Sequence, residues 1–158
     1  MRNKIIMLLV FLLTVSCTHE KITENTQSEW SLINKIETEK WNEGKIISSL
    51  GAPNDIHENE KQDLKYLIYD YPKSNHQKWS FEISNKGELR NITFLPNSSN
   101  RNDFSSEQLS SKWIGCVKQK STDSSQHYIR YTYFLECGEK HKAFMNKVGE
   151  VTSISIEI

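Results

Sequence analysis

A short amphipathic helix with an abrupt end is the feature that most constrains this chain. In segment 42–53, Asn-Glu-Gly-Lys-Ile-Ile-Ser-Ser-Leu-Gly-Ala-Pro, the apolar residues share one helical face. Thr38 or Asn42 can cap the start of this helix. Gly51 can adopt the left-handed conformation that closes a helix, and Pro53 blocks further helical turns. The sequence therefore predicts a helix that ends at Gly51.

An earlier helix and several later strands are predicted around it. Trp30, Ile33 and Ile36 form a narrow apolar stripe after Ser28, a possible N-cap. After Pro53 we expect a polar strand around His57, then strands at 66–71 and 79–83, a hairpin turn at 84–87, and a return strand through Ile92 and Phe94. Segment 79–83 alternates apolar and polar residues, so one of its faces is buried and the other is wet.

The second half repeats this order in a weaker form. Segment 149–154 resembles 87–92, and the tyrosine strand around Tyr131 aligns with the one around Tyr66. Any two hairpins with Gly-Glu turns would look partly alike, so coincidence is the alternative. We predict an α+β fold in which short helices pack on an antiparallel sheet and the helix-helix-sheet unit is duplicated in tandem. The expected units are residues 28–96 and a smaller one at 104–158, joined by a polar linker at 97–103.

The N-terminus has the pattern of an export signal. A basic start and an apolar run from Ile5 to Leu13 precede Thr14-Val15-Ser16-Cys17. This pattern resembles the lipobox of bacterial lipoproteins, which implies a signal peptide at 1–16 and lipidation of Cys17. An ordinary secretory signal with an incidental cysteine is the alternative. Residues 17–27 are polar and are predicted to be a flexible tether. By the same resemblance, Thr18 in place of Asp favours the outer membrane.

Composition argues against several functions. Removal of residues 1–16 takes away Arg2 and Lys4, which leaves 18 basic against 20 acidic residues, a net charge of −2. A chain with this charge has no electrostatic footprint for nucleic acid. Cys116 and Cys137 remain, and in an exported protein two such cysteines most often form a disulfide. Two buried reduced thiols are the alternative if the compartment oxidises poorly.

Motifs for catalysis and cofactors are missing from the sequence. There is no Gly-x-Ser-x-Gly, no His-Glu-x-x-His and no glycine-rich phosphate loop, and the five histidines are scattered. We therefore expect no catalytic residue, no metal, no cofactor and no small-molecule substrate.

The aromatic residues are the one feature of the sequence that gives positive evidence for a binding surface. We expect Trp79, Phe81 and Tyr66 to lie in the core. A second group is hard to bury at once in so small a domain, and exposed aromatic residues make good interface anchors. This candidate binding surface comprises Tyr69, Tyr71, Trp113, Tyr128 and Phe134. The alternative places all of them in one core.

Leu50-Gly51-Ala52-Pro53, closing a helix before aromatic strands, resembles the SmpA/OmlA (BamE-like) family of outer-membrane lipoproteins. The resemblance covers roughly residues 38–94, although Asn42-Glu43-Gly44 stands where the family has Gly and Thr. It implies two short helices on a small antiparallel sheet. The wider group includes secreted β-lactamase-inhibitor-like proteins built from two tandem copies of that unit, and both branches imply a binding surface.

Together these features suggest a lipoprotein anchored in the outer membrane and facing the periplasm. Its expected role is that of a non-catalytic protein-binding or envelope-assembly scaffold module, with another envelope protein as its partner. The alternative function is an anchored inhibitor of a hydrolase.

Overall fold

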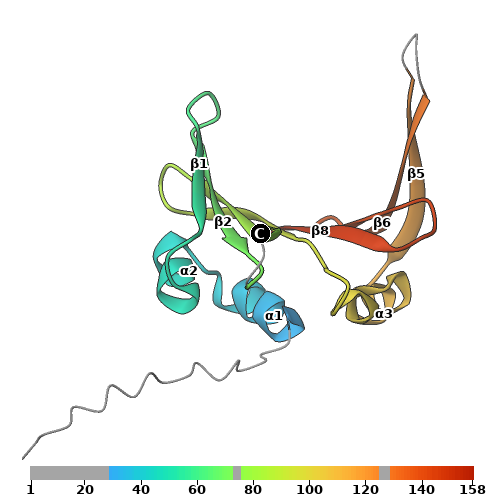
Figure 1. The fold of residues 1–158 in the computed structure, drawn as a ribbon, viewed down its shortest axis with the longest axis horizontal. Coiled ribbons are helices and arrows are strands. Elements are labelled where there is room, and N and C mark those ends of the chain that lie inside the picture. The colour runs from blue at the N-terminus through green and yellow to red at the C-terminus, as the bar shows by residue number, and fades with distance from the viewer. Residues whose placement is uncertain (1–28, 73–75, 125–128) are drawn as a thin grey trace, which may run out of the picture.

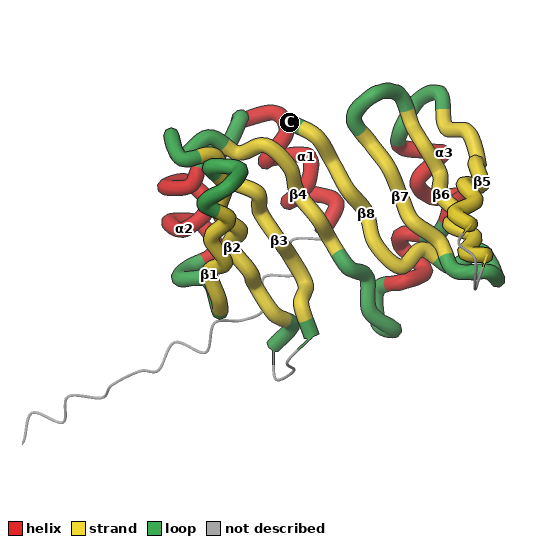
Figure 2. The backbone as a smooth tube through the Cα atoms, turned by 90° about the horizontal axis from the view of Figure 1, so that it is seen from above, coloured by secondary structure: helices red, strands yellow, loops and turns green. Residues whose placement is uncertain are grey.

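One continuous antiparallel sheet dominates the computed structural model, which describes residues 29–72, 76–124 and 129–158 (Figure 2). The described residues form eight strands in the order β1-β2-β3-β4-β8-β7-β6-β5. The strands are β1 (Asp55–Asn59), β2 (Leu64–Asp70), β3 (Gln77–Ser84), β4 (Leu89–Phe94), β5 (Cys116–Ser124), β6 (Ile129–Cys137), β7 (His141–Met145) and β8 (Val151–Glu157). The helices are α1 (Glu29–Glu39), α2 (Glu43–Leu50), the 3-10 turn η1 (Arg101–Phe104) and α3 (Ser106–Lys112).

The predicted fold class was wrong. The chain is not a pair of small α+β units with helices on separate sheets, because β4 pairs with β8 and merges all strands into one sheet. At this seam Ile92 lies opposite Ile156, and Phe94 lies opposite Ile154. The structure is also richer in strands than expected. Much of this difference comes from β5, whose polar sequence lacks the apolar alternation that reveals a half-buried strand.

All the helices lie on one face of the sheet, and the outer hairpins rise from the other (Figure 1). The predictions for the first two helices are confirmed. Asn42 caps α2 by accepting a hydrogen bond from the Lys45 N–H, and Gly51 follows with a φ of 84°. The predicted stripe of α1, Trp30, Ile33 and Ile36, is buried against the sheet.

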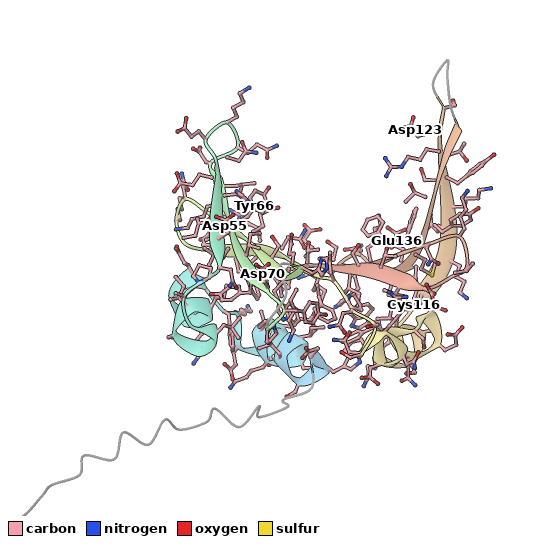
Figure 3. All side chains as sticks on the ribbon, viewed as in Figure 1. Asp55, Tyr66, Asp70, Cys116, Asp123 and Glu136 are labelled. Carbon is pink, nitrogen blue, oxygen red and sulfur yellow. A yellow bond between two sulfur atoms is a disulfide. The ribbon has the colours of Figure 1, made fainter. Side chains whose placement is uncertain are left out.

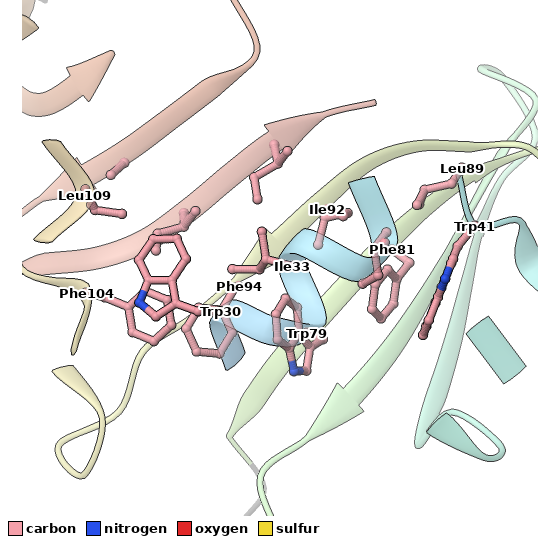
Figure 4. Packing of buried hydrophobic residues seen from close by; sticks show 14 of the residues in the cluster. Trp30, Ile33, Trp41, Trp79, Phe81, Leu89, Ile92, Phe94, Phe104 and Leu109 are labelled. Carbon is pink, nitrogen blue, oxygen red and sulfur yellow. The ribbon is translucent and has the colours of Figure 1, made fainter. Parts of the chain in front are cut away.

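The core is a single cluster between the helices and the sheet (Figure 4). Alternate strand residues point into it, so Ile92 and Phe94 are buried, as are Ile154 and Ile156 across the seam. Trp30 of α1 stacks on Phe104 at a centroid distance of 4.8 Å. This contact joins the helix of the first half to the second half.

The predicted disulfide is confirmed. Cys116 and Cys137 lie directly opposite each other on β5 and β6, and their sulfur atoms are bonded. In the described part of the chain, no helix has the length and apolarity needed to cross a membrane. The predicted signal peptide, Cys17 and the tether at 17–27 lie outside the described residues, as does Tyr128.

Candidate binding surface

The face of the sheet away from the helices has a floor of small polar side chains. On the two central strands, Asn91 and Thr93 of β4 lie opposite Glu157 and Ser155 of β8. The Ser155 hydroxyl donates a hydrogen bond to the Asn91 side-chain oxygen at 3.1 Å. Because the neighbouring residues in these strands point into the core, alternation places these polar side chains on the open face.

Two walls stand beside this floor. The hairpin β1–β2 rises on one side and β5–β6 on the other, with Tyr66 and Glu136 on the inner sides (Figure 3). We call the helix-free face between these hairpins the trough. A cleft of about 650 Å³ occupies the end near the C-terminus, and its lining includes Glu82, Asn91, Ser155 and Glu136. Both halves of the chain therefore contribute to one concave surface.

The first wall carries a phenol paired with a carboxylate. Tyr66 of β2 lies directly opposite Glu82 of β3, so the phenol and the carboxylate are neighbours on the open face. Burial raises the pKa of Tyr66, and the negative charge of Glu82 raises it further. Tyr66 is therefore a neutral phenol beside the Glu82 carboxylate.

The second wall combines an ion pair with two aromatic rings. Glu136 of β6 lies 3.3 Å from Lys142 of β7 and accepts a 2.6 Å hydrogen bond from Gln119. The Lys142 ammonium lies 4.7 Å from the ring centroid of Phe134, whose ring lies 6.3 Å from that of Phe144. This wall is internally neutralised and partly apolar.

The predicted aromatic residues do not form one surface. Tyr69 is buried and donates a hydrogen bond to the Gly51 carbonyl at 3.0 Å. Trp113 is also buried, with its ring 4.5 Å from that of His141. Tyr71 is half-buried and donates to the Leu95 carbonyl at 2.6 Å. Of the four members that the structure describes, Phe134 is the one on the trough side of the sheet.

The sequence did contain a signal for part of the trough. The alternation in 79–83 predicted a wet face for β3, and Glu82 lies on that face. Trp79 and Phe81 are in the core as predicted, whereas the assignment of Tyr66 to the core was wrong. Tyr66 is half-buried on the open face because its strand has large side chains on both faces. Among the described residues, no three His, Cys, Asp or Glu side chains gather where they could hold a metal.

Comparisons with known proteins give little further information. No family model and no curated protein matches the chain. Among solved structures, it is similar to a DUF4309 family protein (YjgB) from Bacillus subtilis, with 9% identity over 75% of this chain and 78% of that one. The TM-score is 0.45, a level of similarity that assigns neither a family nor a function to this chain.

Proposed function

We propose that this chain is a lipid-anchored, non-catalytic protein-binding module that faces the periplasm from the outer membrane and receives its partner in the trough. The observation that supports this proposal is the trough itself. One face of the sheet is covered by helices, and the other is concave and polar, with no helix of the described residues on it. Its mixture of hydroxyl, amide, charged and aromatic groups suits an interface that must also be soluble when empty.

The position of α1 supports an outward orientation for the trough. The predicted tether leads into Glu29, which begins α1 in the helical layer. An extended tether at 17–27 would reach at most about 40 Å from a lipid on Cys17. The described chain therefore begins on the side opposite the trough, and the proposal directs the trough away from the point of attachment.

Site-specific photocrosslinking in the native envelope tests the binding surface. A photoreactive benzoylphenylalanine replaces Ser155 on the trough floor in one variant and exposed Ser111 on α3 in the matched control. We expect Ser155 to crosslink to another envelope protein and Ser111 not to do so. The Thr93→Trp substitution, which fills the floor, should abolish the crosslink in the first variant. Equal crosslinking from both faces, or no effect of Thr93→Trp, would contradict the proposal.

Membrane fractionation tests the anchor separately. Cys17→Ser should release the protein from the outer-membrane fraction and abolish incorporation of labelled palmitate. If the variant stays in that fraction, the lipid anchor is wrong whatever the trough binds.

The two raised hairpins also favour the second function, inhibition of a secreted or periplasmic hydrolase, because they could hold a protruding loop beside an active site. A panel of β-lactamases, proteases and lysozymes separates the two functions. Nanomolar inhibition that is lost in Thr93→Trp would select the inhibitor, whereas a blank panel together with the Ser155 crosslink would select the scaffold.

A further inference from the structure

The two walls of the trough differ in charge balance. On the second wall, Glu136 is neutralised by Lys142. On the first wall, Glu82 has Tyr66 as its partner, and among the described residues no Lys or Arg lies within ion-pair distance of it. Glu157, at the end of the floor, lies beside Lys140, whose carbonyl accepts a hydrogen bond from the Glu157 N–H at 2.9 Å. Of the two wall carboxylates, Glu82 and Glu136, Glu82 is therefore the one without a cation partner among the described residues.

The lining of the cleft shows the same asymmetry. Five carboxylates and three Lys or Arg side chains line it. Of these three cations, Lys142 is paired within the trough, and Arg90 is paired with Glu88 at 3.3 Å. Lys140 is the remaining cation of the lining. The empty trough therefore has an excess of negative charge that a bound cation would offset.

Glu82 is well placed to accept such a cation. Its side chain is half-buried on the open face beside the neutral Tyr66 phenol, and none of the ion pairs of the described residues includes it. A charge-assisted hydrogen bond from Lys or Arg is stronger than one between neutral groups. Across the trough, Phe134 of β6 lies opposite Phe144 of β7, next to the Glu136–Lys142 pair on the same face of the sheet. The two rings offer apolar contact.

The floor limits how a polypeptide can bind. β4 is paired with β3 on one side and with β8 on the other, so the backbone of the floor has no free edge. A partner cannot add a strand there and must bind through side chains. The small residues Asn91, Thr93 and Ser155 leave room between the larger walls.

We infer that the trough binds a protruding loop of a partner protein that presents a Lys or Arg to Glu82 and an apolar side chain to Phe134 and Phe144. This inference rests on the proposed function and adds the chemical class of the partner. The loop lies across the floor, with its basic residue at the first wall and its apolar residue at the second. Charge selects the loop, and the aromatic pair adds contact area.

Fluorescence anisotropy with model loops tests the charge preference. The probe is the disulfide-closed peptide Cys-Gly-Phe-Lys-Arg-Phe-Gly-Cys with a fluorescent label, and its twins carry Glu-Glu or Gln-Gln in place of Lys-Arg. The protein is the full lipidated chain in non-ionic detergent. We expect the basic loop to bind about tenfold more tightly than the acidic twin, and the difference to shrink as salt is raised.

Two isosteric variants locate the effect. Glu82→Gln keeps the shape of the side chain and removes its negative charge, and should weaken binding of the basic loop about fivefold. The matched control Glu107→Gln removes an exposed carboxylate of α3 on the helical side and should leave binding unchanged. Circular dichroism establishes that both variants are folded.

Several outcomes would overturn the inference. One is tighter binding of the acidic or neutral loop, and another is equal affinity of the wild type and Glu82→Gln for the basic loop. Failure of all three loops to bind at millimolar concentration would also overturn it. If any of these results were found while Ser155 still crosslinked to an envelope protein, the proposed function would stand and the partner would be of a different class. Absence of the Ser155 crosslink would instead contradict the proposed function.

Discussion

The two halves of the sheet have the same number of strands but very different cores. In the first half, α1 and α2 cover β1–β4 and enclose large side chains such as Trp41, Trp79 and Phe81. In the second half, the 3-10 turn and the seven-residue α3 cover the sheet together with part of α1, whose Glu37 is hydrogen bonded to His141 of β7 at 2.8 Å. Every residue of β5 after Cys116 is exposed, so no apolar side chain anchors the rest of that strand to the core.

A covalent bond takes the place of some of that missing core. The disulfide between Cys116 and Cys137 holds β5 to β6 at the end where α3 leads into the sheet. Small cores are commonly supplemented by disulfides in exported proteins. The comparison indicates that burial stabilises the first half, whereas the second half depends on a crosslink and on its seam with β4.

The largest expected effect is the loss of a ring from the core of the first half. Phe81 is fully buried and lies between Tyr69 and Trp79, with ring centroids at 5.7 and 5.9 Å. Phe81→Ala should lower the free energy of unfolding by about 4 kcal/mol. Leu135→Ala, at a buried site of the second half, should cost about 3 kcal/mol. Urea denaturation followed by tryptophan fluorescence measures both, and a larger cost for Leu135→Ala would reverse the comparison.

Removal of the disulfide should have the next largest effect. Replacing Cys116 by Ser and Cys137 by Ala opens the loop between them and should lower the free energy of unfolding by about 3 kcal/mol. The change should be local. We expect amide hydrogen exchange to rise in β5 and β6 while the amides of β2 and β3 keep their protection until global unfolding. Uniform loss of protection in all strands would show that the halves do not differ in this way.

Local signals account for the parts of this fold that the sequence predicts. Asn42 and Gly51 define α2 because capping depends on neighbours within one turn. The alternation in β3 likewise assigns Phe81 and Glu82 to opposite faces without knowledge of any partner strand. These elements were predicted from residues close together in the chain.

The rest depends on contacts between distant residues. Ile92 and Ile156 meet at the seam, yet nothing local in either strand selects the other as its neighbour. The trough depends on that seam, because it brings Glu82 and Glu136 to one cleft. β5 was missed for a related reason, since its hydrogen bonds to β6 hold a polar strand that no apolar pattern marks.

The two helix caps provide a matched test at a smaller scale. Asn42 accepts from the Lys45 N–H at 2.9 Å, and Ser105 accepts from the Gln108 N–H at 3.3 Å. Asn42→Ala should cost about 1 kcal/mol and Ser105→Ala about half of that, because the second hydrogen bond is longer. Thermal unfolding of both variants measures the difference. A greater cost for Ser105→Ala would show that the second half depends more on its single α-helix than the comparison assumes.

The smallest effect should come from three tyrosines, all of which belong to the first half or its boundary. Burial is the largest cause of the raised pKa of Tyr66, Tyr69 and Tyr71 above the usual value near 10. A phenol whose pKa is higher in the folded state stabilises the fold fully below its unfolded pKa and loses that contribution as pH rises through the folded pKa.

The free energy of unfolding should therefore begin to fall above about pH 10, as the unfolded chain forms phenolates more readily than the folded one. Tyr69→Phe removes one titrating group from a buried site and should make this fall shallower. Urea unfolding between pH 8 and 11, with phenolate absorbance as a second signal, measures the slope. An unchanged slope in Tyr69→Phe would mean that alkaline sensitivity arises outside the core of the first half, and the contrast between the halves would then rest on packing alone.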